Sequence, residues 1–174
     1  MGIQFETDYN METLTAMAKS LRKTVRKKRS RRVHIFAAVV LILGLLTILA
    51  TTAGGEPLGA SGVVTLLAML VVILVSLFED KLNAWFARKR LLPGTEHAVA
   101  TFEEDGYVSA TGVTESRFSY AQIVAVAETA RYFVFALSSH HTQAYDKRNI
   151  RGGSVEDFRA FIAEKTGKSI ANIK

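Results

Sequence analysis

Few side chains in this sequence stand in a pattern that can perform chemistry, and the pair His140-His141 is the first candidate, as a metal site. Adjacent residues on a strand point in opposite directions, and Asp146 is the only nearby acidic partner. We therefore interpret the histidines as the polar tip of a hairpin. The sequence has no P-loop, G-x-G-x-x-G, G-x-S-x-G or H-E-x-x-H motif and no cysteine. We expect no catalysis, cofactor or metal, with an enzyme acting on lipids through 103–105 or 140–141 as a minor alternative.

A dense run of basic residues indicates a second kind of chemistry, the binding of anions. RKTVRKKRSRR, residues 22–32, directly precedes an apolar segment, and further basic residues follow a second one. Cations at such positions set membrane topology and attract anionic head groups, whereas nucleic-acid binding would favour interleaved aromatic residues. We expect membrane lipids as partners and no nucleic acid. The predicted head-group or topology residues are Arg22, Lys23, Arg26, Lys27, Lys28, Arg29, Arg31, Arg32, Arg88, Lys89 and Arg90.

Three further cations, Lys147, Arg148 and Arg151, form a local basic patch in front of two glycines. Loop cations of this kind can hold anionic head groups or phosphorylated partners, although a solvated loop is the simpler interpretation. We treat them as a candidate anion-binding loop. Trp85, beside Arg88–Arg90, suits an anchor at the membrane interface, with packing against the soluble domain as the alternative.

Two apolar segments must position these residues. Val33–Ala53 has no Asp, Glu, Lys or Arg over 21 residues, and Val63–Phe78 has none over 16. The first spans roughly 31 Å as a helix, enough for the hydrocarbon core, and neither has the polar face of a soluble helix. A short Gly/Pro loop joins them, so we predict a transmembrane hairpin with spans of about 33–53 and 61–78. A buried helical pair and a cleaved signal peptide are the alternatives.

The charge distribution predicts the orientation of this hairpin. Residues 1–90 hold 13 Lys/Arg and 6 Asp/Glu, a net charge of +7, whereas residues 91–174 hold 9 and 10, a net charge of −1. The connecting loop contains only Glu56 as a charged residue. The positive-inside rule then places both termini in the cytoplasm. We predict a multi-pass protein of the cytoplasmic (inner) membrane.

Residues 93–174 are predicted as a cytoplasmic antiparallel β domain closed by a C-terminal helix. Short alternating segments are separated by turn pairs such as Asp105-Gly106. A helix begins at the N-cap Ser154, with Asp157 completing a capping box, and ends at Gly167; the tail after it is expected to fray. This α+β layout is that of a pleckstrin-homology-like domain. The six expected strands are 97–104, 107–112, 116–120, 123–128, 131–137 and 143–146.

The residues before the first span are predicted to connect the membrane to this domain. Residues 1–9 contain a short strand signal at Gly2–Thr7, which we expect to join the C-terminal sheet. From the N-cap Asn10, an apolar face between Met11 and Val25 predicts a helix. No Pro or Gly separates it from the first span, so we expect one helix that continues, with or without a bend. Residues 10–92 thus form a juxtamembrane helix plus the hairpin.

Several short motifs along the chain carry a resemblance. They are I-x-F-E at residues 3–6, T-F-E-E-D-G at 101–106, F-S-Y-A-Q-I at 118–123, E-T-A-R-Y-F at 128–133, D-K-R at 146–148 and V-E-D-F-R-A-F-I at 155–162. Together with the two central spans, they are similar to the YcxB-like family of bacterial membrane proteins. The resemblance implies a two-span protein with a cytoplasmic pleckstrin-homology-like domain. It implies no catalytic activity, so no functional residues are transferred.

These observations favour a non-enzymatic function. We hypothesise a membrane-anchored adaptor or regulatory protein that binds a protein partner or anionic lipid. The alternative is a homo-oligomeric structural assembly, lipid- or pore-associated, in which the apolar face between Met11 and Val25 supports self-association.

Overall fold

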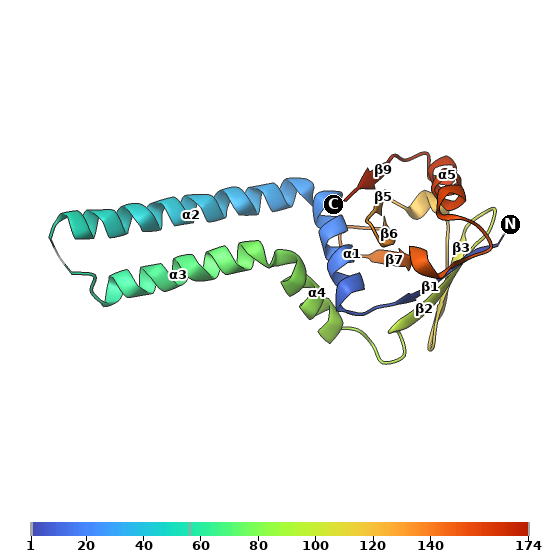
Figure 1. Cartoon of the computed structure of the whole chain (residues 1–174), viewed down its shortest axis with the longest axis horizontal. Helices are drawn as coiled ribbons and strands as arrows, with labels where there is room; N and C mark the ends of the chain where they lie inside the picture. The colour runs from blue at the N-terminus through green and yellow to red at the C-terminus, as the bar shows by residue number, and fades with distance from the viewer. Residues whose placement is uncertain (1, 56, 174) are drawn as a thin grey trace.

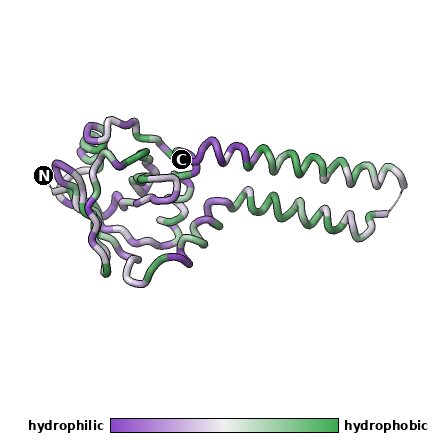
Figure 2. Tube along the Cα trace, turned by 180° about the vertical axis from the view of Figure 1, so that it is seen from behind, coloured by the Kyte–Doolittle hydropathy of each residue, from purple (hydrophilic) through white to green (hydrophobic). Residues whose placement is uncertain are grey.

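The structure is a computed structural model that describes residues 2–55 and 57–173, and it consists of a long helical hairpin and a β-rich domain (Figure 1). Helix α2, Lys27–Ala53, and helix α3, Ala60–Leu77, form the hairpin. Both are long and apolar enough to cross a membrane, and neither is buried within the chain. Figure 2 shows hydrophobic residues along the hairpin and hydrophilic ones where α2 meets the domain. An exposed apolar pair suggests a membrane protein rather than a buried core.

The two hairpin helices are in close contact where a glycine faces a methionine. A Cβ atom added to Gly44 would lie 2.8 Å from Met69 Sδ, which is closer than real Cβ contacts. A hydrogen atom at this position lets the helix backbones approach, as small residues do between membrane helices. The hairpin is therefore held by close packing on its inner side, while its outer faces carry exposed Leu, Ile and Val side chains.

Helix α1, Met11–Lys23, is separate from α2, which corrects the expectation of one continuous helix. The chain turns at residues 24–26, where the N–H groups of Thr24 and Arg26 donate to Ser20 and Leu21 carbonyls. No Pro or Gly marks this turn in the sequence. Its cause is tertiary, because the buried Leu14 and Leu21 on α1 pack within the chain while α2 runs away from it (Figure 1). Helix α4, Glu79–Lys89, likewise breaks from α3 at Phe78.

The domain contains two sheets, and the hairpin is inserted between the first two strands of one of them. This first sheet has the order β4-β3-β2-β1-β8, and the second has the order β7-β6-β5-β9. β1 pairs with β2 from Ile3↔Phe102 to Asp8↔His97 and also with β8, so the N-terminal strand lies inside the C-terminal sheet. The strands are β1 Ile3–Asp8, β2 His97–Phe102, β3 Tyr107–Thr111, β4 Glu115–Phe118, β5 Ala125–Glu128, β6 Tyr132–Ala136, β7 Thr142–Asp146, β8 Ile150–Arg151 and β9 Ile170–Asn172.

The C-terminal tail forms a strand, which corrects the expectation that it frays. β9 pairs in parallel with β5, from Val126↔Ile170 to Glu128↔Asn172. Ile173 is buried with Ala127 and Tyr132, so the apolar residues of the tail fix it to the sheet. A parallel pair also makes the second sheet mixed rather than purely antiparallel. The segment expected as a strand at 116–120 ends at Phe118, because Ser119 caps a 3₁₀ turn, η1 Tyr120–Gln122.

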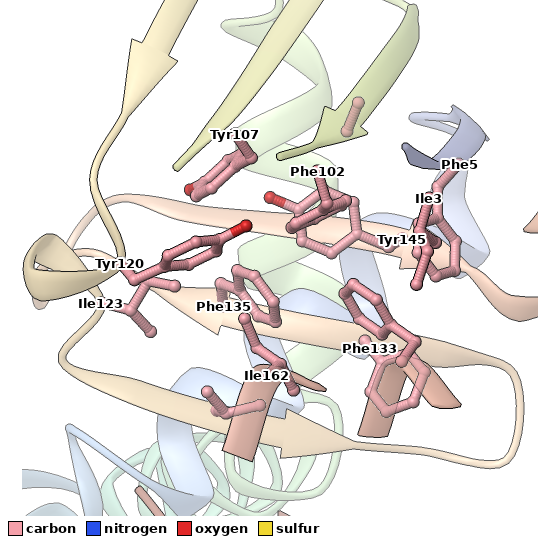
Figure 3. Packing of buried hydrophobic residues seen from close by; sticks show 13 residues of the cluster. Ile3, Phe5, Phe102, Tyr107, Tyr120, Ile123, Phe133, Phe135, Tyr145 and Ile162 are labelled. Atoms are coloured by element: carbon pink, nitrogen blue, oxygen red, sulfur yellow. The ribbon is translucent and has the colours of Figure 1, made fainter. Parts of the chain in front are cut away.

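Helix α5, Val155–Thr166, closes the domain over an aromatic core. Ser154 and Asp157 form the expected capping box, and Gly167 ends the helix in the left-handed conformation at φ 61°. Phe158 of α5 packs edge-on to Phe5 and Phe102, with ring centroids 4.6 and 4.7 Å apart. Figure 3 shows Phe5 of β1 among core residues from both sheets. The first strand of the chain therefore contributes directly to the core that the C-terminal strands and helix complete.

Candidate functional site at the junction of hairpin and domain

The candidate site is the junction where α1 packs against α4 and separates the hairpin from the domain. Leu14 and Leu21 of α1 are buried, as is Ala84 of α4, whose small side chain permits close helix packing. α1 also contacts β6 and β7 of the domain. Thr13 fixes this contact, since its hydroxyl donates to the Asp8 carbonyl at 2.6 Å and lies 3.1 Å from the Tyr132 hydroxyl. The ends of the hairpin nearest the domain are thus attached to it through α1 and α4.

A forked ion pair joins the ends of α1 and α4. Arg22 donates from Nε and an Nη to the two carboxylate oxygens of Asp80, at 2.7 and 2.6 Å. This bidentate geometry is the strong form of the arginine–carboxylate pair. The hydrogen bond to Asp80 raises the pKa of Arg22 above its ordinary value. Arg22, predicted as a head-group or topology residue, is therefore engaged inside the protein.

A second acidic residue lies beside this pair. Glu79 Oε2 is 3.8 Å from Arg22 Nε and 3.8 Å from His34 Nε2. Among the described residues this oxygen is buried and accepts no hydrogen bond, and the same holds for the hydroxyl of Ser20. The start of α4 thus presents two carboxylates to the basic end of α1, which also suits the positive end of the α4 dipole.

Arg26 connects the turn between α1 and α2 to the β6–β7 loop. Its Nε donates to the Ser139 carbonyl at 2.6 Å, and an Nη lies 2.8 Å from His140 Nδ1. The histidine pair therefore sits at a hairpin tip, as expected from the sequence, and it contacts the basic segment. No cluster of three metal-ligating side chains occurs within residues 2–55 and 57–173.

The other basic residues next to the hairpin are exposed. We call Lys27, Lys28, Arg29, Arg31, Arg32, Arg88, Lys89 and Arg90 the flanking cations. None of them forms an ion pair with another described residue, and Lys23 is exposed as well. Their charges are available to anions outside the chain.

Trp85 lies on an exposed face of α4. Its side chain is 44% exposed, stacks edge-on to Phe86, and has Lys89 Nζ 3.6 Å from the ring centroid. Leu82 on this helix and Phe78, directly before it, are also exposed. An indole beside a cation at the end of a span has the composition of a membrane-interface anchor.

A groove of about 720 Å³ runs between α1, the β5–β6 turn and β9. Its lining is mostly apolar, with two lysines. A smaller apolar hollow of about 420 Å³ lies against the start of α4 and shares two of the same residues, Met11 and Lys81. The groove residues are Met11, Glu12, Thr15, Ala16, Lys19, Lys81, Thr129, Ala130, Arg131, Tyr132, Asn172 and Ile173.

The three cations of the candidate anion-binding loop each face a carboxylate. Lys147 Nζ is 3.0 Å from Glu128, Arg148 is 3.1 Å from Asp146, and Arg151 is 3.0 Å from Glu6. Lys147 also donates to the Thr129 carbonyl at 2.7 Å. These contacts join η2 (Lys147–Asn149) and β8 to the sheets, so the loop cations have a structural role in the domain.

Glu128 accepts hydrogen bonds from two cations. Arg159 of α5 donates to both of its oxygens at 2.8 Å, and Lys147 donates from the other side. The hydrogen bonds from Arg159 and then Lys147, acting against burial, lower the pKa of Glu128 to about 2. The buried carboxylate thereby ties α5 to β5 and η2.

Sequence reasoning identified the basic residues of the junction but missed the groove and the acidic partners. Glu79 and Asp80 directly follow an uncharged span, and a basic run precedes the other span, so their opposite charges were an available signal. The groove had no such signal. Its walls come from α1, a β turn and the C-terminal strand, which only the folded chain brings together.

These features suggest a membrane protein in which an α+β domain carries two long apolar helices. Residues 102–162 match the family model described as YcxB-like protein, from the end of β2 into α5. The resemblance stated from the sequence is thereby confirmed over this part of the domain. The comparisons with curated proteins and with solved structures gave no match.

We expect the Arg22–Asp80 pair to couple the hairpin to the domain energetically. In a double-mutant cycle with Arg22→Gln and Asp80→Asn, the coupling free energy should be about 1–3 kcal/mol, because both side chains are mostly buried. Denaturant unfolding of the full chain in detergent, followed by near-UV circular dichroism, measures it. The matched control is the exposed pair Arg117–Glu103, for which we expect below about 1 kcal/mol. Equal coupling in both cycles would contradict the structural role of the junction pair.

Glu128 should make stability depend on pH in a defined window. Its pKa is about 2 when folded against an ordinary 4.5, so its stabilisation is complete above about pH 5 and disappears as pH falls towards 2. Glu128→Gln should lower the free energy of unfolding by about 3 kcal/mol at pH 7 and by progressively less at pH 4 and 3. Unfolding curves at each pH test this. Glu156→Gln, whose side chain is 76% exposed and 3.7 Å from Arg159, is the control and should have little effect.

Proposed function

We propose that this protein is a membrane-anchored adaptor or regulatory protein without catalytic activity. Helices α2 and α3 insert into the bacterial cytoplasmic membrane, with both termini in the cytoplasm. The domain, which we propose to be pleckstrin-homology-like, is held at the membrane surface, where the protein binds anionic lipid. Antiparallel strands in two sheets and a closing C-terminal helix support the pleckstrin-homology-like assignment.

One observation carries this proposal: the described cations divide into two groups at the junction. After residue 93, all described Lys and Arg residues except Lys168 form ion pairs with carboxylates of the chain. The flanking cations have no such partners among the described residues, although they are the densest positive charge in the sequence.

Unpaired charge at the ends of two apolar helices favours an anionic surface as its partner. Each Lys or Arg near such a surface contributes about 1 kcal/mol of attraction. Eight flanking cations therefore supply a large and salt-dependent attraction to anionic head groups. The paired cations of the domain supply much less, because their own carboxylates already neutralise them.

The alternative of a homo-oligomeric assembly loses its main support. The apolar face between Met11 and Val25 was the motive for self-association, but Leu14 and Leu21 of that face are buried inside the chain. We therefore propose the adaptor and not the assembly.

The proposed orientation predicts a labelling pattern in a chain that has no native cysteine. In spheroplasts of a bacterial host, Leu58→Cys, between the two hairpin helices, should react with an impermeant maleimide. Lys168→Cys, in the domain, should react only after the membrane is permeabilised. Labelling of Lys168→Cys in intact spheroplasts would refute the proposed topology. Labelling of both cysteines in intact spheroplasts would refute insertion.

The flanking cations predict a preference for anionic lipid. In reconstituted membranes, spin-labelled phosphatidylglycerol should be immobilised by the protein more strongly than spin-labelled phosphatidylcholine, and 1 M salt should reduce the difference. The triple variant Lys27→Gln, Lys28→Gln, Arg29→Gln should lose at least about half of the free-energy preference. The control removes three exposed but paired cations, Arg117→Gln, Arg148→Gln and Arg151→Gln. An equal loss in both variants would mean that net charge, and not the flanking position, is responsible.

A further inference from the structure

The groove along α1 combines an apolar lining with positive charge. Met11 and Ala16 supply half-buried apolar surface, and the buried Tyr132 and Ile173 lie behind it as part of the lining. Lys19 and Lys81 line the same groove, and neither forms an ion pair with another described residue. A ligand that matches this lining has an apolar chain and an anionic group.

The one carboxylate in the groove does not neutralise these lysines. Glu12 is paired with Arg131, which also lies 2.9 Å from Asp146. Glu12 of α1 and Asp146 of β7 are thus both paired with Arg131, and Asp146 is also paired with Arg148. The lysines therefore remain the charges that an incoming anion meets.

The groove adjoins a second, apolar hollow that reaches the end of the hairpin. The hollow at the start of α4 shares Met11 and Lys81 with it and is otherwise lined by Phe78, Leu82 and Trp85. Phe78 directly follows the last residue of α3. An apolar chain can thus pass from the end of a membrane helix to the groove along exposed apolar side chains.

We propose that the groove binds one anionic phospholipid taken from the cytoplasmic leaflet. One of its acyl chains lies against Met11 and Ala16, above the buried Tyr132 and Ile173, and its phosphate is held by Lys19 and Lys81. The volume of about 720 Å³ falls within the usual range for ligand pockets, about 300–1,000 Å³. This inference rests on the membrane anchoring proposed above and adds a discrete single-lipid site to a general attraction.

The position of the groove next to the hairpin favours a lipid over two other possible occupants. An acidic amphipathic segment of a partner, or a second copy of this chain, would also complement the lining. Either would have to approach from water, whereas the apolar surface leads into the groove from the end of a span. A lipid already lies there at high local concentration.

Native mass spectrometry of the full chain, released from nanodiscs of mixed phosphatidylglycerol and phosphatidylcholine, tests the site. We expect one phosphatidylglycerol per chain to remain bound after the other lipids have been stripped. Lys19→Gln with Lys81→Gln should reduce this retention by about tenfold or more. Thr15→Phe, which fills the groove and leaves both lysines in place, should reduce it as well. The charge-matched control, Arg117→Gln with Lys168→Gln, should retain the lipid.

Each other result overturns the inference. Equal retention of phosphatidylcholine, or unchanged retention in both groove variants, would exclude an anionic-lipid site here. A dimer that Thr15→Phe dissociates would identify a second copy as the occupant, and a co-purified protein lost in the same variant would identify a partner segment.

The failure of this inference can be told apart from failure of the proposed function. If the spin-label experiment shows an anionic preference that the flanking-cation variant loses, while no lipid is retained in the groove, only the groove site is refuted. If the spin-label experiment shows no anionic preference at all, the proposed lipid-binding function is refuted.

Discussion

The whole architecture depends on the pairing of β1 with β2 across the inserted hairpin. Six residues of β1 are in register with six of β2, although the hairpin and two further helices lie between them in the sequence. Because both chain ends of the insertion enter neighbouring strands, the insertion must leave and return at one edge of the domain. Helices α1 and α4 satisfy this condition by packing on each other, and the Arg22–Asp80 pair fixes their ends. The core then follows, because Phe5 on β1 packs against Phe102 on β2 and Phe158 on α5.

This arrangement separates two roles for positive charge in one chain. In the domain, the described arginines and lysines other than Lys168 form ion pairs with carboxylates and so join strands and helices. Arg159 and Lys147, for example, both pair with Glu128. Beside the hairpin, the flanking cations remain exposed, whereas Glu79 and Asp80 at the start of α4 lie within ion-pair distance of Arg22. The division explains how a domain of nearly balanced charge can be attached to a strongly basic segment beside the hairpin without pairing the exposed cations with its own carboxylates.

Much of the fold was readable from local patterns, because each depends on neighbours in sequence. The two uncharged runs predicted both hairpin helices, and Ser154, Asp157 and Gly167 predicted the limits of α5. The errors arose where distant contacts override local preference. The turn at residues 24–26 has no breaker residue and exists because α1 packs on α4, and the tail becomes β9 because β5 offers a free edge. The groove could not be predicted for the same reason, because its walls come from segments distant in sequence that meet only after the strands have paired.

The position of the insertion also orders events during synthesis. β1 leaves the ribosome first, yet its partner β2 begins only at His97, after both apolar helices. The N-terminal strand therefore cannot pair with β2 until the residues of the whole hairpin have been synthesised. Since Phe5 is fully buried in the finished core, the domain cannot complete itself before the hairpin has brought its two ends together. The core of the β-rich domain is therefore completed only after the whole insertion has been synthesised.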